Sequence, residues 1–116
     1  MPTPTPARWA EMTADAPMAL LERRRVIGEK VMISHVTLHA GCEVPVHSHE
    51  NEQFTCILSG RLEFTLGDDR RRVTVRAGEV LHLPSNIPHG AFAPEETAVL
   101  DIFAPPSAET GIDRKG

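Results

Sequence analysis

Short segments of alternating apolar and polar residues, separated by glycine, proline and aspartate, run through most of this 116-residue sequence. In residues 61–66, for example, Leu and Phe alternate with Arg, Glu and Thr, so one face would be buried and the other would meet water. Segments of the same kind are expected at 20–27, 30–39, 52–58, 71–75, 80–83, 90–93 and 97–104. No segment has a convincing helical period, and the pattern therefore predicts an all-β sandwich or barrel.

The length of the chain is that of one domain, which we expect to span residues 20–106. Residues 1–19 begin with proline at every second position, which disfavours a helix and a paired strand alike, and they are predicted to form an N-terminal arm. Residues 107–116 follow two consecutive prolines and are polar, so a flexible C-terminal tail is expected there.

Composition argues against several classes of partner. The formal net charge is -4, with no pervasive basic surface for a phosphate backbone, so nucleic acid is not expected. No apolar run approaches the ~20 residues of a membrane helix, and the first residues do not resemble a secretory signal. Cys42 and Cys56 form neither a disulfide framework nor a redox pair. These features predict a cytoplasmic protein without a membrane partner.

Four polar side chains have the spacing of a metal site on a β scaffold. His47 and His49 are two residues apart on an extended segment and would project toward the same side. Gln53 opens the next expected strand, and His89 follows a proline-stiffened turn. Imidazoles suit a divalent transition metal, and Zn, Ni, Mn, Fe and Cu all remain open. The other histidines, His35, His39 and His82, are expected on strand surfaces or in supporting positions.

These residues resemble the first conserved motif of the cupins, G-x5-H-x-H-x3-E-x6-G. Gly41, His47, His49 and Gly60 match it, and Gln53 takes the position of the usual glutamate. The resemblance implies a single-domain cupin jelly-roll β-barrel that binds its metal through the two histidines, Gln53 and a further histidine. It also implies a homodimer, which is common among such proteins.

The second cupin motif, G-x5-P-x-G-x2-H-x3-N, is matched by Gly78, Pro84 and His89. Asn86 replaces its central glycine, and Ala93 replaces its final asparagine. The resemblance makes His89 the remaining metal ligand.

Glutamine at position 53 bears on the chemistry, because a neutral amide leaves the charge of a bound metal uncancelled. Such a centre is a stronger Lewis acid and holds higher oxidation states less well, which favours polarising a carbonyl group over redox chemistry. The alternative is that Gln53 is a weak or absent ligand beside three histidines.

Cupins with glutamine at this position include the KdgF-type proteins of pectin degradation, which convert 4,5-unsaturated monouronates into linear keto sugars. The likeness extends over residues 84–89 and 101–106, and it implies that Asp101 and Phe103 face the metal pocket, with Asp101 transferring a proton. The residues agree: the two side chains share one face of the last strand, where a carboxylate is costly unless it meets water, a cation or a substrate.

One position departs from that family. An arginine suited to a substrate carboxylate usually follows the two prolines, but Ser107 stands here. Arg23, Arg25 or Arg114 would have to reach the mouth of the pocket instead.

The favoured hypothesis is a metal-dependent isomerase or tautomerase that acts on a small-molecule substrate, a sugar acid or a similar enolisable compound. The metal would act as Lewis acid and Asp101 would shuttle the proton. Two alternatives stay open at this point: a metal-dependent dioxygenase that uses the same ligands, and a non-catalytic cupin that binds a metal or a small ligand.

Overall fold

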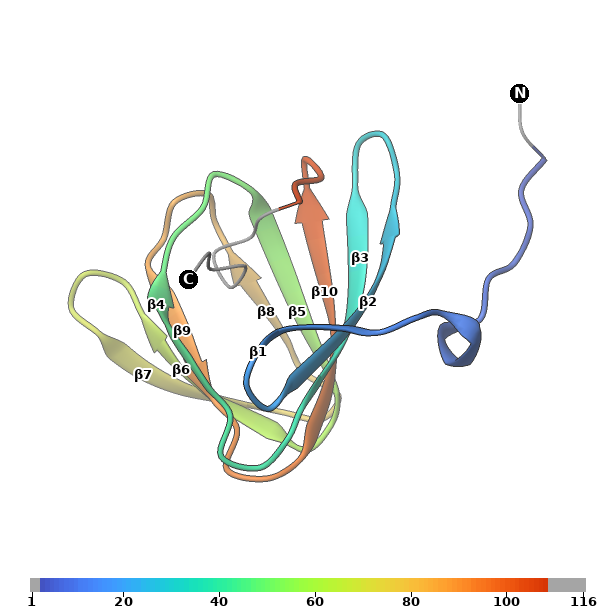
Figure 1. Cartoon of the computed structure of the whole chain (residues 1–116). Coiled ribbons are helices and arrows are strands. Elements are labelled where there is room, and N and C mark those ends of the chain that lie inside the picture. The colour runs from blue at the N-terminus through green and yellow to red at the C-terminus, as the bar shows by residue number, and fades with distance from the viewer. Residues whose placement is uncertain (1–2, 109–116) are drawn as a thin grey trace.

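The computed structural model describes residues 3–108 as two antiparallel β-sheets packed face to face (Figure 1). The larger sheet contains, in spatial order, β1 (Asp15–Met18), β2 (Leu21–Ile27), β3 (Met32–Leu38), β10 (Thr97–Ala104), β5 (Glu52–Ser59) and β8 (Val80–Leu83). The smaller sheet contains β4 (Glu43–His47), β9 (His89–Phe92), β6 (Arg61–Leu66) and β7 (Arg71–Arg76). The prediction of an all-β fold is confirmed.

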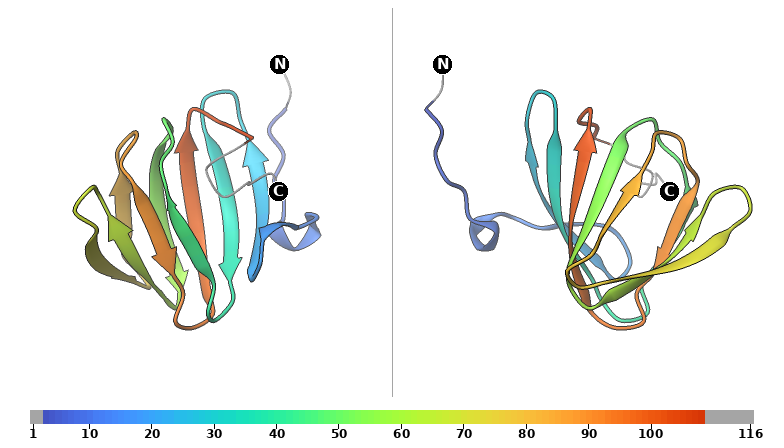
Figure 2. Two further views of the ribbon diagram at one scale, coloured as in Figure 1. Left: turned by 60° about the vertical axis from the view of Figure 1, so that its left-hand side comes forward. Right: turned by 180° about the vertical axis from the view of Figure 1, so that it is seen from behind.

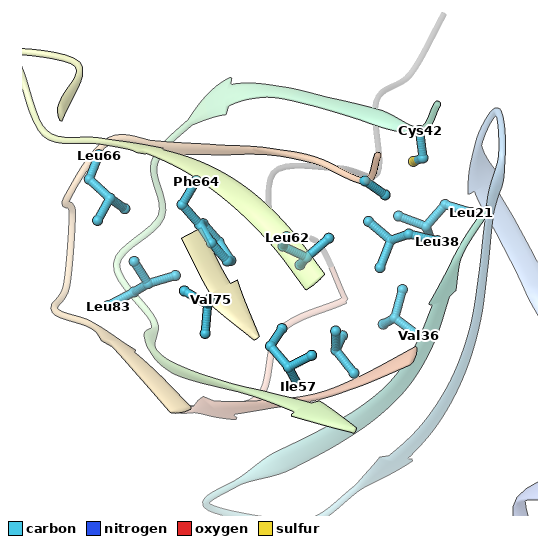
Figure 3. Close-up of a cluster of buried hydrophobic side chains, with 12 residues drawn as sticks. Leu21, Val36, Leu38, Cys42, Ile57, Leu62, Phe64, Leu66, Val75 and Leu83 are labelled. Atoms are coloured by element: carbon cyan, nitrogen blue, oxygen red, sulfur yellow. The ribbon is translucent and has the colours of Figure 1, made fainter. Parts of the chain in front are cut away.

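The core lies between the sheets, because each strand turns alternate side chains inward (Figure 3). In β3, for example, buried and half-buried residues alternate along the whole strand. The cluster consists of Leu21, Val36, Leu38, Cys42, Ile57, Leu62, Phe64, Leu66, Val75, Leu83, Ala93 and Val99. Both cysteines are unpaired thiols, as the sequence indicated.

Several connections gather at one end of the sandwich. The β2–β3 hairpin, the β4–β5 connection, the β8–β9 loop and the end of β10 all lie there, at the top of Figure 1, and Figure 2 shows the same end from two other sides. Both segments that carry the metal motifs are therefore at the same end of the molecule. No helix among residues 3–108 is long and apolar enough to span a membrane.

The N-terminal region is more structured than the sequence indicated. Within the predicted arm of residues 1–19, a short 3-10 helix, η1 (Trp9–Glu11), is followed by β1, which pairs with β2. The buried guanidinium of Arg23 holds β1 by donating to both carboxylate oxygens of Asp15, from Nη2 at 2.6 Å and from Nε at 3.2 Å. These bonds lower the pKa of Asp15. Most of the tail predicted at 107–116 lies outside the described residues.

The turn between β5 and β6 depends on the fully buried side chain of Thr97. Its hydroxyl accepts a hydrogen bond from the Arg61 N–H at 3.1 Å and can donate to the carbonyl oxygen of Arg61 at 2.9 Å or of Glu95 at 3.0 Å. Gly60 has a φ of +79°, and a Cβ there would lie 2.6 Å from the Glu96 carbonyl oxygen. The close approach of this turn to β10 therefore requires glycine.

We predict that Thr97→Val lowers the free energy of unfolding by about 1–3 kcal/mol, because it leaves buried backbone groups without a hydrogen bond. Urea unfolding followed by circular dichroism measures the change. The matched control is Thr74→Val on the exposed face of β7, which should stay within about 0.5 kcal/mol of wild type. Equal losses in the two variants would contradict this account of the turn.

A second prediction concerns His39, at the end of β3. Its Nε2 lies 2.6 Å from Oε2 of Glu22 and its Nδ1 3.0 Å from Oε1 of Glu96, and the bond to Glu22 first, then the bond to Glu96, raises its pKa above 6.5. A pKa that is higher in the folded state stabilises the protein below the unfolded value, and this contribution disappears as pH rises through the folded value. The stability difference between wild type and His39→Gln should therefore shrink as pH rises above 6.5. Thermal melts across that range test this, and parallel curves would refute it.

Candidate metal centre

His47 reaches the interior because β4 contains a β-bulge. Val44 pairs with Ala91 and His47 pairs with His89, so β4 has one more residue than β9 between these pairs. The extra residue reverses the alternation, and both Val44 and His47 face the barrel cavity. A Cβ on Gly90 would lie 2.9 Å from the Val44 carbonyl oxygen, so the absence of a side chain there makes room for the bulge.

His49 lies beyond the end of β4, in the connection to β5, rather than on the same strand as the sequence spacing predicted. Its carbonyl oxygen accepts a hydrogen bond from the N–H of Asn86 at 2.8 Å, which joins the two motif segments. Asn86 has a φ of +67°, in the left-handed region. Asparagine tolerates that conformation better than most residues, which explains how it replaces the glycine of the cupin motif.

The three imidazoles converge at the end of the barrel. Their candidate ligand atoms all lie within 4.8 Å of one another. The ring centroid of His89 is 4.4 Å from that of His47 and 4.9 Å from that of His49. The sequence prediction that these histidines come together is confirmed.

A backbone carbonyl oxygen lies next to Nδ1 in each of the three rings. The Nδ1 atom lies 2.8 Å from the Pro45 oxygen in His47, 3.1 Å from the Asn51 oxygen in His49 and 3.0 Å from the Ile87 oxygen in His89. A carbonyl only accepts, so it favours the neutral tautomer with the proton on Nδ1, and in that tautomer the Nε2 lone pair is available to a metal. Burial, chiefly, lowers the pKa of His89 to about 4, which keeps this ring neutral at physiological pH.

The contact between Gln53 and His49 bears on whether a cation fits among the three histidines. Its side chain is buried, and its Oε1 lies 3.1 Å from Nε2 of His49. Both ring nitrogens of His49 face an acceptor, the Asn51 oxygen and Oε1 of Gln53, each at 3.1 Å, and the neutral ring can donate to only one of them. In the tautomer with the proton on Nδ1, Nε2 and Oε1 face each other with lone pairs. A cation between them would turn this repulsion into coordination. The donor set of three imidazoles and one amide oxygen therefore fits a divalent transition metal.

The side chain of Asp101 lies next to Gln53. Its Oδ1 accepts hydrogen bonds from the Thr55 hydroxyl at 2.7 Å and from Nε2 of Gln53 at 3.3 Å. Desolvation raises the pKa of Asp101 to about 6, although these two hydrogen bonds oppose the shift. The ring of Phe103 packs edge-on against His49, with centroids 5.8 Å apart. The carboxylate of Asp101 thus borders one cavity of about 60 Å³ together with His47, Gln53 and His89.

Residues 34–103 match the family model described as the cupin domain. The chain belongs to the cupin family. It is 32% identical over 83 residues to a protein named H2HPP isomerase from Bacillus subtilis, a match that covers 70% of this chain but only 34% of that protein.

The structures most useful for comparison are also cupins. KdgF from Halomonas sp. superposes with a TM-score of 0.83 and 22% identity, over 91% of this chain and 97% of KdgF. An RmlC-like cupin from Shewanella frigidimarina NCIMB 400 has a TM-score of 0.81 and 20% identity, over 88% of this chain and 91% of its own. At these identities the likeness establishes a shared fold.

The cupin barrel thus brings together every site residue that the sequence singled out. Their roles as ligands and proton carrier stay predictions. His82 lies elsewhere, 2.6 Å from a Glu52 carboxylate oxygen and stacked on Phe54. Two contributors were missed: Thr55, which the two-residue period places on the face of Gln53, and Asn51, whose side-chain amide donates to the Pro105 carbonyl oxygen.

We predict that the cupin binds one equivalent of Zn²⁺, and that His89→Ala weakens binding by about 100-fold or more, because loss of a ligand should exceed the effect of losing its hydrogen-bond partner. Competition with a chromophoric chelator measures the affinity. His82→Ala is the matched control and should bind as wild type does. If both variants bind Zn²⁺ with the wild-type affinity, the three-histidine cluster is not the metal centre.

Proposed function

We propose that this cupin is a metal-dependent isomerase or tautomerase that acts on a small sugar acid or a similar enolisable compound. The observation that carries the proposal is the position of Asp101, which borders the same cavity as His47 and His89 and is held there by Thr55 and by Gln53, the neighbour of His49. Proton transfer between neighbouring atoms of a substrate needs such a group within reach of a polarised oxygen.

In this proposal, different residues bind the metal, transfer the proton and exclude water. His47, His49 and His89 would hold the metal, with Gln53 as a fourth ligand. When bound, a divalent cation polarises a carbonyl or hydroxyl oxygen and stabilises enolate charge. Both hydrogen bonds to Asp101 go to Oδ1, and among residues 3–108 none goes to Oδ2, so Oδ2 is the oxygen available to accept a proton and return it. Phe103 and the apolar lining of the cavity limit the access of water.

Two further observations support an isomerase over a dioxygenase. The four candidate ligands bring no negative charge, so the bound cation keeps its strength as a Lewis acid and is poorly suited to a higher oxidation state. The relative from Bacillus subtilis is named an isomerase, although this chain spans about a third of its length, so that likeness supports the class of reaction. The homodimer and the cytoplasmic location expected from the sequence stay predictions.

The test is the loss of the alkene absorbance of 4,5-unsaturated galacturonate, with the metal-free protein as the background. We predict that Asp101→Asn lowers turnover by about 10²–10⁴-fold, because an amide cannot take up the proton. The affinity for Zn²⁺ should change little, since the three histidines stay in place.

The matched control is Asp68→Asn in the exposed turn between β6 and β7, which should leave turnover unchanged. Undiminished turnover in Asp101→Asn would remove Asp101 from the mechanism. If the metal-loaded wild type does not exceed the background, the uronate is excluded as substrate while the metal centre stands.

A further inference from the structure

Two arginines of β2 have side chains on its inner face. Arg23 and Arg25 alternate with Arg24, and they share the face of Leu21, which is part of the core. Arg24 has the opposite orientation, and its Nε donates to the Met12 carbonyl oxygen at 3.1 Å. An inward-facing guanidinium is costly unless an anion accompanies it.

The two inner arginines differ in how well their charge is matched. Arg23 is buried and makes a bidentate pair with Asp15. Arg25 reaches the same carboxylate only at 3.9 Å, and among the described residues its one hydrogen bond goes from Nη1 to the Ala108 carbonyl oxygen at 3.2 Å. Its side chain is 23% exposed, so solutes can reach it. A guanidinium has five N–H donors, and among the described residues Arg25 uses one of them in a hydrogen bond.

The strand register places Arg25 two strands away from Asp101, directly across β3. Arg25 pairs with Ser34 of β3, and Ser34 pairs with Asp101 of β10. Adjacent strands are about 4.8 Å apart, so the Arg25 and Asp101 backbones are about 10 Å apart, a gap that the long arginine side chain largely covers. All three side chains are on the inner face of the larger sheet.

The side chain of Ser34 is a separate observation that points to a ligand near Arg25 and Asp101. The residue is 1% exposed, and its Oγ has no hydrogen-bond partner among residues 3–108. A buried hydroxyl without a partner costs free energy, and such groups often mark a functional site. In the sheet, Ser34 lies between Arg25, which makes one hydrogen bond among the described residues, and Asp101, which lines the cavity.

We propose that Arg25 binds a carboxylate group of the substrate, with the Ser34 hydroxyl as a further donor. This inference rests on the proposed function and adds that the substrate is an organic acid whose anionic group lies on the β2 side of Asp101. A carboxylate accepts two parallel hydrogen bonds from a guanidinium and would displace the Ala108 carbonyl, a weaker acceptor.

The test compares two ligands that differ in this group. Calorimetric titration of the Zn²⁺-loaded protein with D-galacturonate and with D-galactose should show preference for the acid. Arg25→Gln should raise the Kd for galacturonate by about tenfold or more, because a charge-assisted pair is lost, and should leave the Kd for galactose unchanged. Arg24→Gln, on the outer face, is the matched control and should behave as wild type.

Two companion measurements keep the result interpretable. Zn²⁺ affinity should be the same in wild type and Arg25→Gln, because Arg25 contacts no metal ligand. The free energy of unfolding should change by no more than about 1 kcal/mol, because Arg25 makes one hydrogen bond to a backbone oxygen and one long ion pair with the half-exposed Asp15. Ser34→Ala should also weaken galacturonate binding without lowering thermal stability, since its hydroxyl has no partner to lose. Binding that falls with an intact metal site assigns the effect to anion recognition.

An unchanged Kd for galacturonate in Arg25→Gln would overturn the inference, and so would a wild type that binds the acid and the neutral sugar equally. The proposed function fails by a different result, undiminished turnover in Asp101→Asn. If Arg25→Gln alone loses affinity while Asp101→Asn keeps its activity, the anion site stands and the isomerase mechanism falls. If the reverse is observed, the mechanism stands and Arg25 has no part in it.

Discussion

The β-bulge in β4 is the constraint on which the metal centre depends. With regular alternation, Val44 and Val46 would face the core and His47 would face solvent. β4 has one extra residue between the pairs Val44–Ala91 and His47–His89. This residue turns the side chain of His47 inward and places its imidazole opposite that of His89. Gly90 makes the bulge possible, because a Cβ there would meet backbone and side-chain atoms of β4 at about 3 Å. A packing requirement in β9 thus fixes the orientation of His47, a candidate metal ligand, in β4.

Local backbone geometry prepares the imidazoles for a metal. In each ring Nδ1 lies next to a carbonyl oxygen two residues away along the chain, a contact that favours the tautomer with Nε2 available to a metal. The long-range contacts then position these local units. Asn86 joins the second motif to His49, and Asn51 joins the first motif to the end of β10. Because β10 also carries Asp101, the ligands and the carboxylate are held by one connected set of contacts.

Much of the fold could be predicted from sequence because the signals are local. Alternation gave the bounds of residues 61–66, 80–83 and 97–104 as the structure has them. β1 was missed because it is short, contains Pro17 and is held by Arg23, a contact that no local pattern shows. The bulge was missed because it depends on the register between β4 and β9. The hydrogen-bonded residues Gln53, Thr55 and Asp101 could be predicted only in part. The two-residue period of a strand places Thr55 on the same face as Gln53, but Asp101, which accepts the hydrogen bond of Thr55, lies 46 residues further along the chain.

The groups that suit a cation and the groups that suit an anion lie on different sides of Asp101. The imidazoles and the amide of Gln53 offer lone pairs that suit a cation, while Asp101 is the one acidic side chain among the residues that line the cavity. Beyond it, on the inner face of β2, Arg23 is neutralised by Asp15, and Arg25 is matched only in part. Under the proposed function, a substrate with an oxygen to be polarised at one end and an anionic group at the other would bind with its middle carbons facing Asp101. In the proposed function, a donor set without charge suits Lewis-acid chemistry, and recognition of an anionic group would then fall to a separate guanidinium, that of Arg25.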